Sequence, residues 1–344
     1  MSAEDAAVPE VLEVSKAAKT PRTAKTGALS TVPPRYLVLA GGLSHERDVS
    51  LRSGRRVLDA LRADGVDADL RDADAQLLDV LADSDYAAVF VALHGGAGED
   101  GALREVLDVA GVPYVGSPPA ACRIAWDKPT AKALSLRARL STPASVVLPH
   151  AAFRELGAGA VLDRLVGHLG LPLMIKPARG GSALGCTRVD KPDELPAAMV
   201  SCFSYGEAAL VERFVTGTEV AVTVVDTGDG PRALPAVEVL PLSGVYDYTA
   251  RYTAGHTEYY TPARLSDEEA AAVADTAVVA HRILGLRDLS RVDLVVDSDG
   301  VVQLLEVNTA PGMTETSLLP MAVQAAGLSF GGLLRQLLEQ AAAR

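Results

Sequence analysis

The sequence predicts an α/β protein with more than one packed unit, and three observations support this prediction. From residue 35 onward, short apolar runs alternate with helical segments, which is the pattern of a parallel sheet. Later in the chain a capped helix precedes two β-branched runs joined by a turn, which indicates an α+β part. A chain of 344 residues, 49% of them hydrophobic, is long enough for two or three cores.

Charge and cysteine content limit the classes of function. The net charge is −12, from 44 acidic and 32 basic residues, so we expect no nucleic-acid partner and no membrane partner. The cysteines Cys122, Cys186 and Cys202 have no metal-binding spacing and cannot all pair, which favours reduced thiols and a cytoplasmic location. No apolar run approaches the length of a membrane span. Residues 1–34 lack a signal-peptide core and are expected to form a disordered tail.

Residues 35–119 are expected to form an N-terminal parallel-sheet domain of the Rossmann-like kind. Its predicted elements are, in order, a strand at 36–40, a helix at 53–62, a strand at 87–93, a helix at 100–109 and a strand at 112–116. Parallel sheets bind ligands at the carboxyl ends of their strands, where Glu46 and His94 stand. Both are therefore candidate site residues, although a packed, hydrogen-bonded His94 is an equally good interpretation.

Residues 120–206 form the second predicted part and contain a candidate anion site. A helix is expected at 128–139, and a strand at 171–177 carries Lys176 near its end. The loop 180–185 contains three glycines and a serine, so its backbone N–H groups could approach a phosphate closely. An ordinary glycine-rich hairpin explains the loop equally well, because the loop matches neither the Walker nor the GxGxxG pattern.

Residues 207–344 form the third predicted part. Its expected elements are a strand at 208–215, a helix that begins with the capping box of Ser266 and Glu269, and an amphipathic helix at about 331–343. Residues 246–257 are polar, aromatic and aperiodic, which is typical of a lid over a site.

The hairpin between Arg291 and Asn308 carries the strongest chemical signal. Asp299-Gly300 is a favoured two-residue turn, and with this turn Asp293 lies opposite Glu306. The same register puts the arginine opposite the asparagine, so all four side chains share one face. Two carboxylates and an amide oxygen suit Mg²⁺ beside phosphates, and the arginine could hold an anion.

The alternative interpretation is a hairpin whose acidic face is simply solvated. We regard it as the weaker one, because Val302 and Leu304 fall on the same predicted face as Glu306. A turn one residue longer would break this pairing, so the metal-site hypothesis depends on the register.

Further motifs occur as ordered blocks between about residues 36 and 340. They are Gly41-Gly42-x-Ser44-x-Glu46-Arg47-Asp48-Val49-Ser50, Leu93-His94-Gly95, Gly98-Glu99-Asp100-Gly101, Asp127-Lys128, Lys176-Pro177-Ala178-Arg179-Gly180-Gly181-Ser182, Tyr246-Asp247-Tyr248, Arg291-x-Asp293 and Glu306-x-Asn308-Thr309-x-Pro311-Gly312-Met313-Thr314. Several blocks in this order are far more specific than any one of them. Together they resemble the D-alanine–D-alanine ligases of the ATP-grasp superfamily.

The resemblance implies an ATP-grasp fold preceded by the N-terminal domain, with ATP between the second and third parts. The matched nucleotide-binding residues are Lys128, Lys176, Gly180, Gly181, Ser182, Gly185, Glu212, Glu219 and Arg251. Among them the lysines would contact phosphates, Glu212 the adenine amino group and Glu219 the ribose. Two Mg²⁺ ions, or Mn²⁺ in their place, would bind to Asp293, Glu306 and Asn308.

For the other substrates the resemblance implies two D-alanine molecules. The matched catalytic residues are Glu46, Ser182, Tyr252, Arg291, Gly312 and Ser317. Glu46 would hold the ammonium of the first D-alanine, in a hydrogen-bonded set with Ser182 and Tyr252. The arginine and the glycine N–H would stabilise the oxyanion, and Ser317 would bind the carboxylate of the second D-alanine.

The implied activity is ATP-dependent ligation of two D-alanines through an acyl phosphate for peptidoglycan synthesis, by a chain that could form a homodimer. Both steps build negative charge on oxygen, so cations and N–H donors matter more than a protein nucleophile. Two alternatives stay open: a ligase with another acceptor, such as a hydroxy acid or a biosynthetic amino acid, and a non-catalytic nucleotide-binding homologue. The departures from the family pattern are Arg251 for lysine, Thr249 for glutamate, Ala183 for serine and Trp126 for a small or flexible residue.

Overall fold

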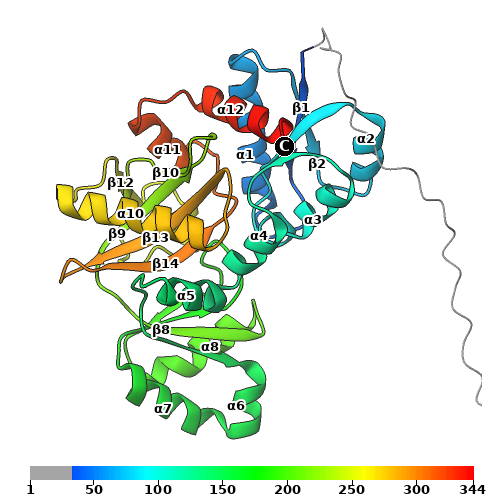
Figure 1. Cartoon of the computed structure of the whole chain (residues 1–344). Helices are drawn as coiled ribbons and strands as arrows, with labels where there is room; N and C mark the ends of the chain where they lie inside the picture. The colour runs from blue at the N-terminus through cyan, green and yellow to red at the C-terminus, as the bar shows by residue number, and fades with distance from the viewer. Residues whose placement is uncertain (1–32) are drawn as a thin grey trace, which may run out of the picture. The chain divides into compact units, whose positions relative to one another are not determined.

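Figure 1 shows the computed structural model, which describes residues 33–344. The tail predicted for residues 1–34 lies outside the described residues, except for Pro33 and Pro34. The described strands group into three sheets, one of them parallel and two antiparallel.

The first sheet is parallel, as the sequence predicts. Its strands, in spatial order, are β2 (Ala68–Asp72), β1 (Arg35–Ala40), β3 (Tyr86–Val91) and β4 (Tyr114–Val115). The connecting helices are α1 (Arg47–Ala63), α2 (Leu77–Asp83), η1 (Gly96–Gly98) and α3 (Ala102–Val109). The prediction omitted β2 and α2, because the ADLRD sequence of β2 has three charged side chains and lies at the sheet edge. Helix α1 begins at Arg47 rather than Ser53.

The second sheet is antiparallel and covered by three helices. Its strands, in spatial order, are β5 (Ser145–Pro149), β8 (Ala208–Arg213), β6 (Leu173–Pro177) and β7 (Thr187–Val189). Its core is completed by apolar side chains of α6 (His150–Leu156), α7 (Ala158–Leu169) and α8 (Leu195–Phe203), the last preceded by η2 (Pro192–Glu194). The predicted domain boundary at residue 206 falls just before β8, although β8 pairs with β5 and β6 of this sheet. The division into three domains stays a prediction.

The third sheet carries the predicted hairpin. Its strands, in spatial order, are β12 (Thr257–Tyr260), β11 (Val237–Pro241), β9 (Gly217–Val225), β13 (Leu289–Asp297) and β14 (Val302–Asn308), with β10 (Arg232–Ala233) beside β9. Helices α4 (Pro119–Trp126), α5 (Lys128–Arg137) and α10 (Asp267–Ile283) pack on one face of it. The capping box of Ser266 and Glu269 at the start of α10 is confirmed.

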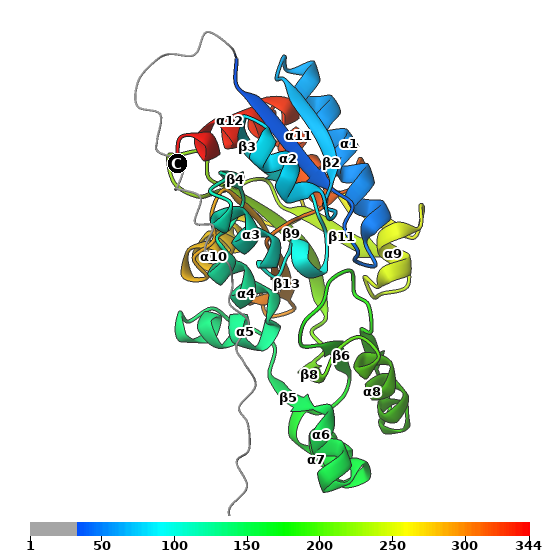
Figure 2. The ribbon, with the colours of Figure 1, turned by 90° about the vertical axis from the view of Figure 1, so that its right-hand side faces the viewer.

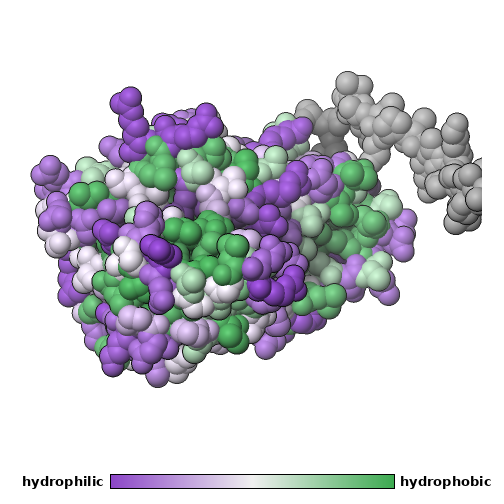
Figure 3. All heavy atoms as spheres, turned by 90° about the horizontal axis from the view of Figure 1, so that it is seen from below, coloured by the Kyte–Doolittle hydropathy of each residue, from purple (hydrophilic) through white to green (hydrophobic). Residues whose placement is uncertain are grey.

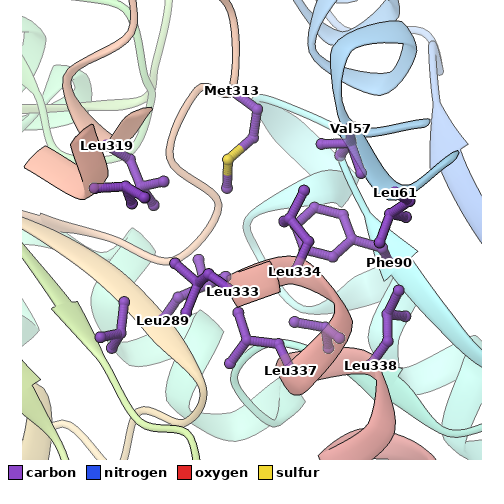
Figure 4. Packing of buried hydrophobic residues seen from close by; sticks show 14 of the residues in the cluster. Val57, Leu61, Phe90, Leu289, Met313, Leu319, Leu333, Leu334, Leu337 and Leu338 are labelled. Atoms are coloured by element: carbon purple, nitrogen blue, oxygen red, sulfur yellow. The ribbon is translucent and has the colours of Figure 1, made fainter. Parts of the chain in front are cut away.

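The last two helices connect the third sheet to the first. Helix α11 (Leu318–Ala325) packs on β9 and β11, whereas α12 (Phe330–Ala342) packs on α1, β3 and β4. Both helices are drawn in red tones near the C-terminus (Figures 1 and 2). Figure 4 shows Leu334 and Leu338 of α12 packed against Val57 and Leu61 of α1 and Phe90 of β3. The two ends of the described chain therefore share one core, and residues 34–344 form one compact unit.

No single helix among residues 33–344 is long and apolar enough to cross a membrane. Helices α11 and α12 would suffice together by length and composition, but they are bent by 104° at their break. Figure 3 shows one face of the molecule, on which hydrophobic and hydrophilic side chains are interspersed.

The close approach of α12 to α1 gives a test of this packing. A Cβ atom added at Gly331 would lie 2.4 Å from the carbonyl oxygen of Ala60. Because backbone must shift, Gly331→Ala is expected to lower the free energy of unfolding by about 1–3 kcal/mol. At Gly167, in helix α7, an added Cβ meets nothing within 4 Å, so Gly167→Ala should raise it by about 0.5–1 kcal/mol. Chemical denaturation measures both, and a stabilised Gly331→Ala would contradict the packing.

Candidate functional site

The four polar side chains of the β13–β14 hairpin pair as predicted, but the loop that sets their register differs from the predicted turn. Arg291 pairs with Asn308, and Asp293 pairs with Glu306. The predicted two-residue turn is wrong: the N–H of Asp297 donates to the carbonyl of Val301 at 3.1 Å, which leaves a three-residue loop. Pairs near the loop, such as Leu294 with Leu304, are accordingly shifted by one residue. A bulge at Leu305 restores the predicted register at the site.

The bulge also decides which side chains face the site. Leu304 lies in the core between the sheet and α10, together with Leu294, and Val302 packs against that core. Glu306 faces the opposite side, where it lines two cavities. The predicted common face of Val302, Leu304 and Glu306 is therefore wrong, because the extra residue reverses the alternation of side chains along β14.

Ion pairs surround the two carboxylates of the hairpin. Arg291 donates from Nε to one oxygen of Asp293 at 2.7 Å and from Nη2 to the other at 2.8 Å. The Lys128 Nζ lies 3.6 Å from Glu306 and donates to the carbonyl of Gly180 at 2.6 Å. Burial alone would raise the pKa of Glu306, but four neighbouring cations together lower that pKa to about 2. Glu306 is therefore an anion at neutral pH.

The larger cavity lies between the second and third sheets and has a volume of about 430 Å³, a size that suits a small-molecule ligand. Most of the predicted nucleotide-binding residues line it: Lys128, Lys176, Gly180, Gly181, Glu212, Glu219 and Arg251. Apolar side chains, including Met174, Val239 and Leu305, supply much of the remaining wall. Two predicted residues do not line this cavity: Ser182 lines the second one, and Gly185 packs against Pro177 and Tyr205.

Behind this cavity lies a lysine that the sequence analysis missed. Glu212 is buried and forms ion pairs with Lys132 on one oxygen and Lys176 on the other. Lys132 also donates to the carbonyl of Pro143 at 3.0 Å. It stands one helical turn after Lys128 on α5, and this spacing of four was the signal that could have identified it. With two lysines on one carboxylate, the cluster keeps a net positive charge.

The glycine-rich loop connects β6 to β7 and contacts Glu46, which lies between β1 and α1. Ser182 donates from its hydroxyl to Glu46, which confirms that part of the predicted hydrogen-bonded set. The side chain of Tyr252, its third predicted member, lies outside the described residues. Burial raises the pKa of Glu46, and the hydrogen bond from Ser182 opposes that rise. The two interpretations of the loop are compatible, because it closes an antiparallel hairpin and also borders the cavity.

A second cavity, of about 110 Å³, adjoins the first. It brings together Glu46, Ser182, Arg291, Gly312 and Ser317, which are the predicted catalytic residues with described side chains. The Ser317 hydroxyl accepts the N–H of Thr314 at 3.0 Å. Arg251, Gly181, Glu306 and Tyr246 line both cavities, so the two spaces meet there.

His94 and Glu99 both line the second cavity. The Nδ1 of His94 is 2.9 Å from the carbonyl of Ala310, and Nε2 is 2.7 Å from the Ser53 hydroxyl. Burial lowers the pKa of His94 to about 4, so the structure favours the packed, neutral interpretation of this histidine. The sequence analysis gave Glu99 no role, although it belongs to a quoted motif and is 6% exposed.

The predicted lid contains a short helix, α9 (Tyr248–Tyr252), capped by Asp247. Arg251 projects from it with its guanidinium carbon 4.2 Å from the centre of the Tyr246 ring, and its Nε donates to the Tyr246 carbonyl at 3.2 Å. This arginine therefore occupies the junction of the cavities, where the family pattern has lysine. Thr249, another departure, is exposed on the same helix.

Comparison with known proteins identifies the family. The sequence model described as "D-ala D-ala ligase C-terminus" matches residues 138–339. The D-alanine–D-alanine ligase of Bordetella petrii is 42% identical over 307 residues, which are 89% of this chain and 92% of that protein. The chain belongs to the D-alanine–D-alanine ligase family.

Solved structures of similar ligases have the same fold. The VanG D-Ala:D-Ser ligase of Enterococcus faecalis superposes with a TM-score of 0.77 at 29% identity, over 90% of this chain and 100% of that one. The D-alanine–D-alanine ligase of Bacillus anthracis complexed with ATP gives 0.72 at 27% identity, over 90% of this chain and 96% of that one. The ATP-grasp fold with a parallel N-terminal sheet is thereby confirmed.

The larger cavity predicts a pH dependence of stability. Burial raises the pKa of Glu219 to about 7, so the folded protein retains a proton that an unfolded glutamate loses above about pH 4.5. Stability should therefore fall as pH rises from about 4.5 to 7. In Glu219→Gln the decrease in the free energy of unfolding between pH 5 and 7.5 should be smaller by about 1–3 kcal/mol, because a shift of one pKa unit corresponds to about 1.4 kcal/mol. Chemical denaturation without nucleotide measures this decrease. The control is Glu258→Gln, the same exchange at an exposed position. A decrease in Glu219→Gln as large as in the unmodified protein would contradict the prediction.

Proposed function

We propose that this chain joins two D-alanine molecules into D-alanyl-D-alanine, with ATP as the energy source, for peptidoglycan synthesis. The observation that carries the proposal is the pair of adjoining cavities, one lined by lysines and the other by Glu46, Arg291 and Ser317. Its support from relatives is the 42% identity with a D-alanine–D-alanine ligase over 89% of the chain. The cytoplasmic location and the homodimer stay predictions.

In this proposal ATP occupies the larger cavity. Its triphosphate would lie at the junction with the smaller cavity, because Lys128, Lys176 and Arg251 bring positive charge there. The glycine-rich loop would cover the phosphates with backbone N–H groups. The base would lie farther in, where Glu212 can accept from an adenine amino group and Glu219 from a ribose hydroxyl.

Asp293, Glu306 and Asn308 are the proposed holders of two Mg²⁺ ions. The donor set fits, because two carboxylates and an amide oxygen on adjacent strands are hard oxygen ligands. Among residues 33–344 no group of three or more His, Cys, Asp and Glu side chains forms a metal cluster, which agrees with a site completed by phosphate oxygens. Bound metal would neutralise phosphate charge, and Mn²⁺ suits the same ligands.

The residues of the smaller cavity would organise two successive steps. In the first, a carboxylate oxygen of the donor D-alanine attacks the γ-phosphorus and ADP leaves, while Glu46 holds the donor's ammonium. In the second, the amine of the acceptor attacks the acyl-phosphate carbon and inorganic phosphate leaves. Arg291 and the N–H of Gly312 would stabilise the oxyanion of that step, and Ser317 would bind the acceptor's carboxylate.

The strongest competing proposal is the same chemistry with another acceptor. It has support from the 29% identity with the VanG D-Ala:D-Ser ligase and from the departures Arg251, Thr249 and Ala183. A non-catalytic nucleotide-binding homologue is disfavoured, because Arg291, Asp293, Glu306 and Asn308 are all present and paired on one hairpin.

A substrate panel tests the proposal directly. The protein is incubated with ATP and Mg²⁺ and with D-alanine alone or paired with D-serine, D-lactate or other amino and hydroxy acids. We expect phosphate release that depends on D-alanine and a product with the mass of D-alanyl-D-alanine. A product formed only with a different partner would favour the competing ligase, and ATP binding without turnover would favour the binding protein.

The contact between Glu46 and Ser182 gives a kinetic prediction. Glu46→Gln should raise the apparent KM for the first D-alanine by about 10- to 100-fold, because a charge-assisted hydrogen bond contributes about 1.5–3 kcal/mol. The KM for ATP should barely change, and the effect should be non-additive with that of Ser182→Ala. Initial rates over both substrates measure this, and a raised KM for ATP alone would remove Glu46 from the donor site.

A further inference from the structure

Glu99 is a buried carboxyl side chain without an ion-pair partner among the described residues. It follows η1, is 6% exposed and lines the smaller cavity. Its Oε1 accepts the backbone N–H of Gly95 at 3.1 Å, whereas Oε2 accepts no hydrogen bond from the described part of the chain. A buried carboxylate without a counter-charge is costly, so this side chain is suited to meet a cationic ligand.

The other carboxyl groups and the imidazole of the smaller cavity already have partners. Glu46 accepts from Ser182, and Glu306 is surrounded by cations that lower its pKa to about 2. His94 uses both ring nitrogens, on the Ala310 carbonyl and the Ser53 hydroxyl. Burial, followed by the charge of Glu46, raises the pKa of Glu99 to about 8, with Arg291 opposing and Glu306 adding to that rise. Glu99 is thus the carboxyl group best able to gain from a new positive charge.

Glu99 is fixed to the segment that leads to the proposed acceptor end of the cavity. The hydroxyl of Thr309 donates to the backbone carbonyl of Glu99 at 3.2 Å. Three residues beyond Thr309 stands Gly312, where an added Cβ would lie 2.7 Å from the hydroxyl of Ser317. Glu46 and Glu99 both lie beside Gly95, whose N–H donates to Glu99 and where an added Cβ would meet the carboxylate of Glu46. The anchors of the two residues differ, because Glu46 accepts from Ser182 of the glycine-rich loop on the nucleotide side, whereas Thr309 ties Glu99 to the segment that leads to the acceptor end.

We propose that Glu99 receives the ammonium group of the acceptor D-alanine and takes up the proton that this group must lose. The inference rests on the proposed function and deepens it. The proton moves from the acceptor nitrogen to Glu99, and the freed lone pair attacks the acyl-phosphate carbon. A C–N bond forms, the C–O bond to phosphate breaks, and phosphate leaves with that electron pair. With a pKa of about 8, Glu99 carries a proton in the free protein at pH 7, and it releases this proton to solvent when the ammonium enters. The ammonium then supplies the missing counter-charge before the transfer, and Glu99 is neutral after it.

Hydroxylamine separates this role from a general effect on the enzyme. It is already a neutral nucleophile at pH 7, so it can attack the donor's acyl phosphate without giving a proton to Glu99. In Glu99→Gln the glutamine keeps the shape of the side chain and its acceptor for Gly95. We expect D-alanyl-D-alanine formation to fall at least about 100-fold, as for loss of a general base, with hydroxamate formation near the wild-type rate. Glu99→Asp should recover part of the ligation.

The matched control is Glu105→Gln, the same exchange at an exposed site on the neighbouring helix α3, which should behave as wild type. Equal losses of dipeptide and hydroxamate in Glu99→Gln would overturn the inference, because they indicate a structural or donor-side role. Full ligation by Glu99→Gln would overturn it as well. A wild-type protein that consumes no ATP with D-alanine, with or without hydroxylamine, would overturn the proposed function and this inference with it.

Discussion

The bulge at Leu305 is the constraint on which the site depends. The three-residue loop of the β13–β14 hairpin sets a register in which Asp293 would face Leu305, and Glu306 would turn toward the core. One extra residue on β14 corrects this, so Arg291, Asp293, Glu306 and Asn308 all point away from the apolar side of the sheet. The same strand can therefore bury Leu304 on one face and present charge on the other.

Charge balance within the site follows from that arrangement. The protein carries a net charge of −12, yet Lys128, Lys176, Arg251 and Arg291 gather where the two cavities meet. Each cation is held by a carboxylate or a carbonyl, and Lys132 offsets Glu212 from behind so that Lys176 is not fully neutralised. Removal of Arg291 would leave its hydrogen-bonded partner Asp293 buried and unpaired, which costs about 3–5 kcal/mol. In the proposed function the same cations would attract phosphate.

Local sequence signals predicted the parts of this protein that local physics determines. The parallel sheet of 35–119, the capping box at Ser266 and the pairing of Asp293 with Glu306 were all accessible from residue patterns. The bulge was not, because an extra residue on one strand leaves no mark on side-chain type, and the correct pairs came from a turn that was one residue too short. Lys132 had a sequence signal in its spacing of four from Lys128, but its ion pair with Glu212 appears only in the folded chain. Glu99 was missed because its importance comes from the lack of a charged partner in the cavity, which only the folded chain shows.

The glycine-rich loop shows how the two substrate sites are joined. Ser182 and Ala183 have φ of 52° and 55°, a left-handed conformation that costs a non-glycine residue about 1–2 kcal/mol. The hydrogen bond from Ser182 to Glu46 helps to hold the loop in that shape, and Gly181 allows the close approach, since a Cβ there would lie 3.2 Å from Glu46. A donor ammonium at Glu46 would share the same carboxylate. In the proposed function, occupation of the amino-acid site and the position of the loop over the nucleotide cavity would therefore be coupled through Glu46, which precedes α1.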